Sequence, residues 1–416
     1  MNIWLIQTGE PFPTDDSVKQ MRTSLLADKL VEKGHSVIWW TSAFDHIKKK
    51  WIFTKDTEIQ KKDGLTILAL KGTGYKNNIS LMRFIDHRIV AWKFYRMAGK
   101  MAKPDFIIAS MPPHDFAYQA VMFAKNNNIP ILVDIRDPWP DIFLEHIPSV
   151  LRRVAKIVLL NEFNMVKKIT MYANGLIAVT ESFLKWGLLY ANRKITENDK
   201  VFFLGYKKQN NIDLSRVNPK FIELEKELKN KFIIFFVGTL SKSYHNPLIL
   251  VKAAEIIKEY KDIHFLIAGE GELYQELLSA SENNSNLTIT GWLNQQEIEF
   301  WLKHSKIGVC PARKPVYLPT NKAFTYLSAG LPVISAFQGE LKEIIEKYQI
   351  GFYYTPNDVN AIVNYIKILY QDSNLYDKMS ENAKKVFEEM FDADKIYGEY
   401  ANHIEQITEN IGIHKS

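Results

Sequence analysis

The chain has 416 residues, of which 46% are hydrophobic and 24% are charged, and its formal net charge is +6. This length favours two domains of roughly 200 residues each, and the composition excludes a disordered chain. The single cysteine, Cys310, excludes an internal disulfide and a cysteine-rich metal site. The start, MNIWLIQTGE, lacks a basic lead and a cleavage site, and the sequence holds no long apolar run, so we expect a cytoplasmic protein.

The positive charge is concentrated in the first half of the chain. Residues 1–200 carry 29 Lys and Arg against 20 Asp and Glu. Such a surface suits an anionic phospholipid or a lipid pyrophosphate, although a solvated basic surface explains the excess equally well. No nucleic-acid-binding motif accompanies the basic residues, so we expect no nucleic-acid partner.

The N-terminal segments alternate between strand and helix. We expect a strand at Asn2–Gln7, the loop Thr8–Pro13, a helix from about Ser17 to Lys33 and a strand at Val37–Thr41. Repetition of this order is typical of a doubly wound parallel sheet. The first loop has one glycine, Gly9, which is too few for a dinucleotide-binding fingerprint.

Two later segments combine basic and aromatic residues. Phe44–Phe53 joins three lysines and His46 to a tryptophan, and Ser80–Met101 is expected to be a helix that mixes Arg and Lys with aromatic rings. This pairing suits a phospholipid headgroup layer, and it predicts a peripheral protein on the inner face of the cytoplasmic membrane. The alternative is that the aromatic rings pack into their own domain.

Two loops follow consecutive predicted strands. The first, Met111–Asp115, contains His114 and Asp115, and the second, Ile135–Asp141, contains Arg136 and Asp137. Loops that follow parallel strands meet at one edge of the sheet, so we expect these side chains to project into one cleft. A helix cap and an Arg136–Asp137 ion pair are the plain alternatives.

The second half starts afresh after the linker Gly205–Asn211. We expect a strand at Phe232–Val237 followed by the loop Gly238–His245, then a strand over Leu287–Thr290 followed by a turn. A second doubly wound unit results. Both turns are equally well explained as ordinary strand–helix connections.

The most informative stretch is Pro319–Ser335, PTNKAFTYLSAGLPVIS. Thr320 is a good N-cap for a short helix over Asn321–Ala329, Gly330 suits its left-handed end, and a strand follows. The free N–H groups at the helix start, beside Lys322, suit a phosphate. An ordinary capped helix is the alternative.

This stretch resembles the donor-site helix of GT-B glycosyltransferases of family 4, in which Lys-x-x-x-Tyr-Leu-x-x-Gly-x-Pro-Val recurs; IRDPWPD also resembles a motif of members that act on surface-polysaccharide precursors. The resemblance implies an α/β protein with two Rossmann-like, doubly wound domains facing a central cleft. Residues 1–205 would bind the acceptor, residues 206–385 the nucleotide-sugar donor, and a helix within 386–416 would return to the first domain. The chain departs from the family where Tyr317 and Thr325 replace two glutamates that hold the donor.

The resemblance also implies roles for individual residues. His114 would polarise the sugar, Asp137 would orient the acceptor, and Lys322 would stabilise the leaving diphosphate. The residues expected at the donor are Gly9, Glu10, Thr239, Lys242, Gly291, Trp292, Arg313, Asn321, Lys322, Ala323 and Thr325.

The implied reaction is a retaining, metal-independent transfer of a sugar to a lipid-linked saccharide in O-antigen or capsule assembly. The implied donor is a UDP-sugar, and the sugars considered include N-acetylated amino sugars. No cofactor or metal is expected, since Asp392-Ala393-Asp394 reads as a helix start where acids suit the dipole. Two alternatives stay open: a UDP-sugar 2-epimerase of the same fold, and a non-catalytic partner subunit that has lost the donor site.

Overall fold

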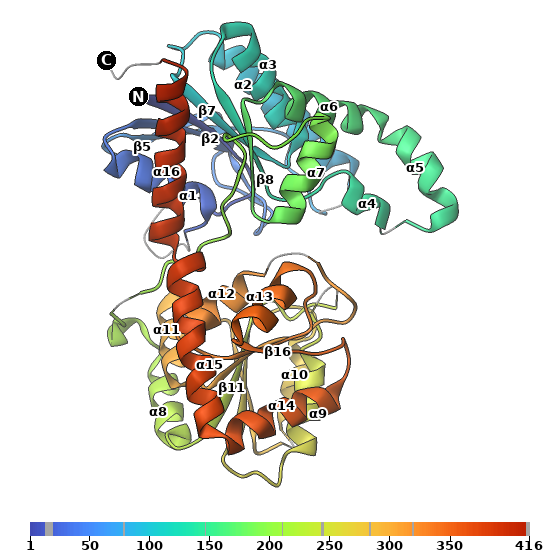
Figure 1. Cartoon of the computed structure of the whole chain (residues 1–416), viewed down its shortest axis with the longest axis vertical. Coiled ribbons are helices and arrows are strands. Elements are labelled where there is room, and N and C mark those ends of the chain that lie inside the picture. Colours follow the sequence, from blue (N-terminus) through green and yellow to red (C-terminus); the bar gives the residue numbers. More distant parts are fainter. Residues whose placement is uncertain are drawn as a thin grey trace. The chain divides into compact units, whose positions relative to one another are not determined.

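A computed structural model describes residues 1–12, 20–77, 80–145, 147–209, 211–242, 245–282, 284–317 and 320–412 (Figure 1). The predicted positions Pro13, Ser17 and Pro319 lie outside these ranges. The chain forms two compact units: Met1–Phe203 with the segment from Ile396 onward, here the N-terminal unit, and Leu204–Lys395, the C-terminal unit.

The N-terminal unit is built on an eight-stranded sheet in the order β10-β9-β8-β7-β1-β2-β6-β5. Every neighbouring pair is parallel except the edge strand β5, which runs antiparallel to β6. A separate two-stranded ladder joins β3 (Phe44–Asp45) to β4 (Lys50–Trp51). The strands of the large sheet are β1 (Asn2–Ile6), β2 (Ser36–Ser42), β5 (Thr57–Lys62), β6 (Leu65–Leu70), β7 (Phe106–Met111), β8 (Ile131–Ile135), β9 (Gly175–Ala178) and β10 (Lys200–Val201).

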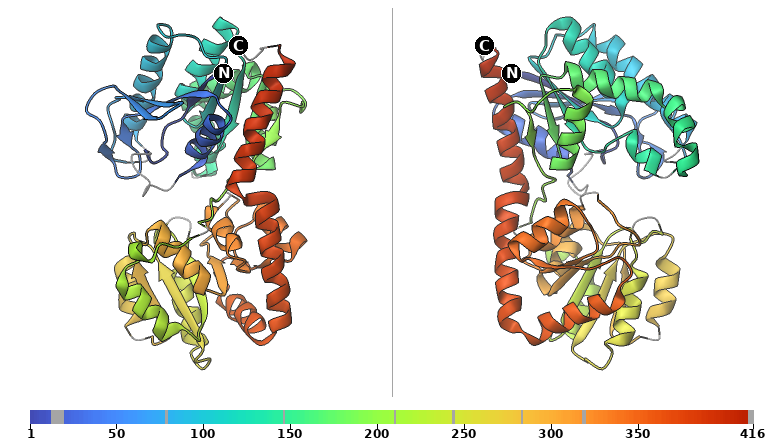
Figure 2. Two further views of the ribbon diagram at one scale, coloured as in Figure 1. Left: turned by 90° about the vertical axis from the view of Figure 1, so that its left-hand side faces the viewer. Right: turned by 45° about the vertical axis from the view of Figure 1, so that its right-hand side comes forward.

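Helices cover both faces of this sheet (Figures 1 and 2), as a buried parallel sheet requires. Four contact one another in succession on one face: α2 (Leu81–Ala98), α3 (His114–Asn127), α6 (Leu160–Tyr172) and α7 (Glu181–Ala191). On the other face lie α1 (Arg22–Glu32) and α16 (Ala393–Asn410). Between β8 and α6 come α4 (Asp141–Glu145), the short helix η1 (Ser149–Leu151) and α5 (Arg152–Val158). Buried aromatic rings fill the core, with Trp4 and Phe94 both packed edge-on against Trp40.

The helix α16 is fastened to the N-terminal unit by several contacts. Glu405 accepts from Lys33 at 2.7 Å and lies 3.1 Å from the ring of His35. The buried ring of Tyr400 stacks on Phe202 with centroids 4.6 Å apart. This helix is therefore an integral layer of the N-terminal unit.

The C-terminal unit holds six parallel strands in the order β13-β12-β11-β14-β15-β16. They are β11 (Phe232–Val237), β12 (Ile263–Ala268), β13 (Leu287–Gly291), β14 (Ile307–Cys310), β15 (Val333–Ser335) and β16 (Gly351–Tyr353). Its helices are η2 (Leu214–Arg216), α8 (Pro219–Leu228), α9 (Leu248–Ile256), α10 (Tyr274–Ser281), α11 (Gln295–His304), α12 (Asn321–Ser328), α13 (Glu340–Tyr348), α14 (Val359–Gln371), α15 (Ser373–Val386) and η3 (Phe387–Phe391). Both units thus have the doubly wound architecture that the sequence predicts.

The described helices include none that is both long enough and apolar enough to cross a bilayer.

Candidate functional site

Three loops at the carboxyl edge of the C-terminal sheet are tied together by backbone hydrogen bonds. Gly238 N donates to Ala268 O at 3.0 Å, and Gly269 N donates to Gly291 O at 2.8 Å. A Cβ atom on Gly269 would lie 1.8 Å from the carbonyl oxygen of Gly238, so only glycine allows this approach. The edge where a doubly wound sheet binds ligands is therefore closely packed and pre-formed.

The helix α12 starts at this edge and is anchored by its own tyrosine. The hydroxyl of Tyr326 accepts from Val237 N at 3.0 Å and lies 3.3 Å from Val309 O, so it joins α12 to two strands. Gly330, with φ of +72°, ends the helix as predicted. Thr320 occupies the N-cap position but its hydroxyl makes no capping bond. The first N–H groups of α12 thus have no side-chain cap from Thr320.

Lys322, on the first turn of α12, lies beside His245. Its Nζ is 2.6 Å from Nε2 of His245, and a Cβ atom on Gly238 would lie 1.9 Å from its Cε. Burial, reinforced by the Lys322 charge, lowers the pKa of His245 to about 4, so the ring is neutral at physiological pH. Nε2 then accepts from the ammonium, and the proton is assigned to Nδ1, which lies 3.4 Å from Pro311 O. Gly238 and His245 together fix the direction of the Lys322 side chain.

The other residues expected at the donor are distributed over the same loops. Thr239 and Lys242 are exposed after β11, and the backbone N–H of Lys242 donates to the carboxylate of Glu272. Trp292 is exposed after β13, where Gly291 has φ of +79°.

The remaining expected donor residues surround α12. Asn321, Lys322 and Ala323 form its first turn. Arg313 lies in the loop after β14, and its carbonyl accepts from the side chain of Asn357 at 2.8 Å. Of the two residues at the family glutamate positions, Tyr317 is exposed, whereas Thr325 is buried and its hydroxyl donates to Asn321 O at 3.0 Å. The hydroxyl group of Thr325 therefore donates its hydrogen bond within α12.

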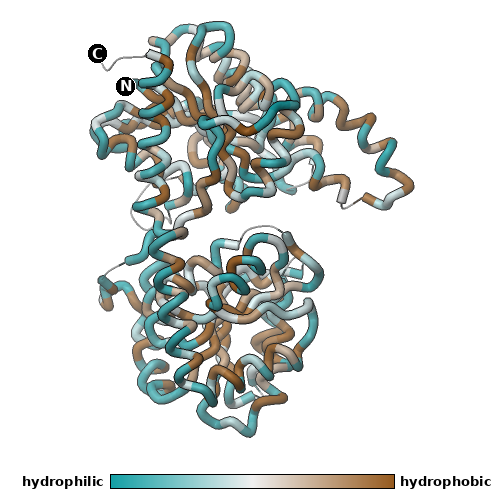
Figure 3. The backbone as a smooth tube through the Cα atoms, in the orientation of Figure 1, coloured by the Kyte–Doolittle hydropathy of each residue, from teal (hydrophilic) through white to brown (hydrophobic). Residues whose placement is uncertain are grey.

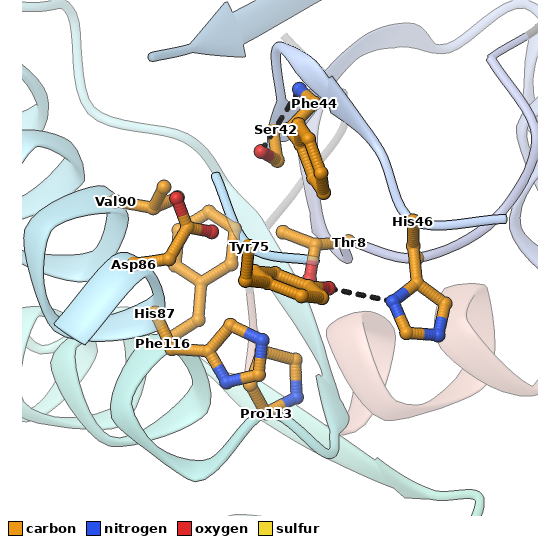
Figure 4. Close-up of a pocket in the computed structure, with 11 residues that line it drawn as sticks. Thr8, Ser42, Phe44, His46, Tyr75, Asp86, His87, Val90, Pro113 and Phe116 are labelled. Atoms are coloured by element: carbon orange, nitrogen blue, oxygen red, sulfur yellow. Dashed lines mark hydrogen bonds between the residues drawn. The ribbon is translucent and has the colours of Figure 1, made fainter. Parts of the chain in front are cut away.

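The N-terminal unit contains a pocket at the carboxyl edge of its sheet (Figure 4). Thr8 and Gly9 follow β1, Ser42 ends β2, and Pro113 follows β7. The open space beside Gly9 and its φ of +90° agree with a turn at this edge. The complete lining consists of Thr8, Gly9, Ser42, Phe44, His46, Tyr75, Asp86, His87, Val90, Pro113 and Phe116.

The polar side chains of this pocket include two uncharged histidines and a tyrosine, beside Thr8, Ser42 and the carboxyl group of Asp86. Nδ1 of His46 lies 2.6 Å from the hydroxyl of Tyr75, whose ring stands centrally in Figure 4. Burial and the nearby Arg83 lower the pKa of His46 to about 4 and that of His87 to about 3. His46 therefore adds no positive charge to the Phe44–Phe53 segment, contrary to its expected basic character. Neutral ring nitrogens and a phenol suit the hydroxyl groups of a sugar.

His114 opens α3 rather than lying in the preceding loop. Its side chain is 2% exposed, Nδ1 lies 3.4 Å from the carboxylate of Glu162, and burial lowers its pKa to about 4. Asp115 and Glu162 share Arg88, at 3.4 Å and 3.3 Å. The expectation that Asp115 projects freely into a cleft is corrected, because its carboxylate faces Arg88.

Glu10 and Arg136 belong to a buried ion-pair network rather than to an open site. Arg136 donates to Asp134 at 3.0 Å, to the hydroxyl of Thr23 at 2.9 Å, and to the carboxylate of Glu10. Arg22 makes a two-bond contact with Asp134, with both distances 2.8 Å. The Arg136–Asp137 pair considered above is thus replaced by pairs with Asp134 and Glu10.

The carboxyl group of Asp137 is partly buried. Burial raises its pKa to about 6, although the charges of Arg136 and Arg83 act to lower it. A carboxyl of this kind changes its protonation close to physiological pH, which is a property of acid–base groups.

Sequence reasoning missed His245 and three pocket residues, Tyr75, Asp86 and His87. No motif marks them, because they come from separate elements that only the fold brings together. The one available signal was the position of His245 at the end of a loop already expected to meet the donor.

Comparison with known proteins identifies this architecture. Residues 218–386 match the family "Glycosyl transferases group 1". Among curated proteins, the O-antigen chain mannosyltransferase C of Escherichia coli is 29% identical over 40% of this chain and 44% of that protein. The chain spans 39% to 67% of the length of the curated relatives it matches.

Two solved structures show the same fold over nearly the whole chain. Sucrose-phosphate synthase from Thermosynechococcus elongatus has a TM-score of 0.72 and 16% identity, covering 98% of this chain and 99% of that one. Alr3699/HepE of Anabaena, crystallised in complex with UDP, has a TM-score of 0.65 and 16% identity over 97% and 99%. The chain therefore has the GT-B fold, and residues 218–386 of its C-terminal unit match the group 1 glycosyl transferases, in agreement with the expected resemblance.

Proposed function

We propose that this protein is a retaining, metal-independent glycosyltransferase that moves a sugar from a UDP-sugar to a lipid-linked saccharide during assembly of a surface polysaccharide. Three findings support the proposal: the group 1 domain, a relative named as an O-antigen mannosyltransferase, and a structural neighbour that binds UDP. Because the proposed acceptor is linked to a lipid, we place the reaction at the cytoplasmic face of a membrane.

The observation that carries the proposal is the position of Lys322 at the amino end of α12. The first-turn N–H groups of Lys322 and Ala323 point out of the helix start, and the ammonium held by His245 adds a full positive charge. These groups would stabilise a bound diphosphate most strongly as its bond to the sugar breaks, because negative charge then grows on the diphosphate. Departure of the leaving group is thereby assisted by groups of this chain.

We assign the N-terminal pocket to the sugar-bearing partners of the reaction. The neutral His46, His87 and Tyr75 can donate to and accept from hydroxyl groups without competing for the diphosphate. In the proposed mechanism His114 polarises the transferred sugar, Asp137 orients the acceptor hydroxyl, and the departing phosphate takes the acceptor proton. Attack then occurs from the face that the phosphate leaves, which retains the configuration of the sugar.

The test is an incubation of the purified protein with a panel of UDP-sugars, with and without a lipid-linked saccharide. The proposal predicts a labelled sugar on the lipid and no conversion of the donor when the lipid is omitted. A new UDP-sugar epimer in the absence of lipid would instead establish the epimerase. Failure to bind UDP, measured by titration calorimetry, would leave only a non-catalytic partner subunit.

A further inference from the structure

The segment from 148 to 160 stands out from the N-terminal unit as an arm (Figure 1). It consists of η1 and α5 and leads into α6. Its large apolar side chains are exposed to an unusual degree, with Val150 at 81%, Ile157 at 73% and Val158 at 76%. Figure 3 shows hydrophobic stretches along the same arm. An exposed apolar surface of this kind marks an interaction site.

The spacing of residues along the arm places its apolar and basic side chains on different sides of a helix. Val150, Val154 and Val158 recur at every fourth position, which places them on one side of a helix. Arg152 and Lys156 are also four apart, and they fall on another side. The segment 148–160 contains no acidic residue. A short helix with one apolar and one cationic side has the pattern of an interfacial helix.

A second copy of the chain fits this surface poorly. Packing two arms against each other would bring the cations of both close together without any acid on either arm to pair them. An anionic bilayer satisfies both sides at once, because the apolar side enters the acyl boundary while the cations stay among the phosphates.

We propose that residues 148–160 form a membrane-docking arm that inserts into the interfacial layer of an anionic bilayer. The inference deepens the proposed use of a lipid-linked acceptor, because it names the element that would bring the N-terminal unit to that lipid. The arm is a different element from the helix α2 and the Phe44–Phe53 segment, for which the sequence also predicts membrane contact.

The test is flotation of the full-length protein with vesicles of equimolar phosphatidylglycerol and phosphatidylcholine, compared with pure phosphatidylcholine vesicles. The wild type should float with the anionic vesicles. The double variant V154E/I157E should bind them at least about tenfold more weakly, because two carboxylates replace inserted side chains. The variant R152Q/R153Q/K156Q should lose about fivefold in affinity per cation removed and should lose the preference for anionic vesicles.

The matched control is L189E/I195E, which alters exposed apolar residues of the same unit outside the arm and should float like the wild type. Circular dichroism and UDP titration of every variant show that the fold and the donor site are intact, so a failure of the arm is distinguished from a failure of the proposed function. Equal flotation of V154E/I157E and wild type would overturn the inference. So would a dimer, seen by light scattering, that V154E/I157E converts to a monomer without any effect of lipid.

Discussion

Nζ of Lys322 lies 2.6 Å from Nε2 of His245, although 77 residues separate them in the chain. The lysine comes from the first turn of α12 and the histidine from the segment between β11 and α9. Because burial keeps His245 neutral, the ring accepts from the ammonium without cancelling its charge. The pair therefore presents an oriented cation at a helix amino end, which is an arrangement suited to a diphosphate.

Replacing His245 by alanine should weaken UDP binding by about tenfold, since a Lys322 side chain that His245 no longer orients must lose more rotamer entropy when it binds. Titration calorimetry with UDP measures the loss. The control H304Q changes a histidine of α11 and should leave the affinity unchanged. If H245A binds UDP as tightly as the wild type, His245 does not orient Lys322 for the ligand.

Adding one methyl group at Gly238 should displace Lys322, because the new Cβ would overlap Cε of that side chain. We expect G238A to reduce UDP affinity even where the protein remains folded. The matched control is G398A in α16, where a Cβ meets no atom within 4 Å and which should be neutral or slightly stabilising. Unchanged UDP affinity in a folded G238A protein would contradict the packing described here.

The variant D137N should stabilise the protein at neutral pH but not in acid. In the folded chain the carboxyl has a pKa of about 6, above its ordinary value of 3.8. Between these values the folded state holds a proton that the unfolded chain has lost, so ionisation of Asp137 lowers stability as pH rises through this window. Removing the charge should therefore raise the free energy of unfolding by up to about 3 kcal/mol above pH 6.

Urea denaturation of wild type and D137N near neutral pH and near pH 4 measures this difference. The control D213N, at an exposed position, should give no such gain. A gain of equal size at both values of pH would show that burial of the charge is not the cause. Transfer activity of D137N should fall while its stability rises, because a group that orients the acceptor is lost.

Breaking the buried pair of Arg22 and Asp134 should be costly. The variant R22M leaves the Asp134 carboxylate with one cation fewer and removes the donor to the carbonyls of Phe202 and Phe203. We expect a loss of about 3–5 kcal/mol in the free energy of unfolding of the N-terminal unit. R216M, which removes an exposed pair with Asp213, should cost less than about 1 kcal/mol. Urea denaturation measures both losses, and similar losses in R22M and R216M would contradict the buried network.

The buried strands were predictable because a parallel sheet covered on both faces leaves continuous apolar runs. The strand Phe232–Val237 has the predicted bounds. The hairpin of β5 and β6 was not predicted, since β5 alternates exposed and half-buried residues and carries lysines at the edge of the sheet. The helix α1 begins at Arg22 after Met21, whose side chain offers no N-cap oxygen to mark the start.

The site was predictable only where one local motif carried it. Lys322, the start of α12 and Gly330 lie within a single stretch whose pattern is legible in the sequence. The ion pair of Glu10 and Arg136 was not predicted, because it joins two loops 126 residues apart. The site contains three further residues whose placement depends on contacts between distant segments: His245, Tyr75 and His87. A single sequence does not reveal such contacts.

The most direct test of the central claim is a crystal structure of the protein with UDP, together with UDP titration of K322A and of K252A, an exposed lysine of α9. We predict that the diphosphate lies at the first turn of α12 within contact of Lys322, that K322A binds UDP at least about tenfold more weakly, and that K252A binds it normally. A diphosphate bound elsewhere, with K322A indistinguishable from the wild type, would contradict the account.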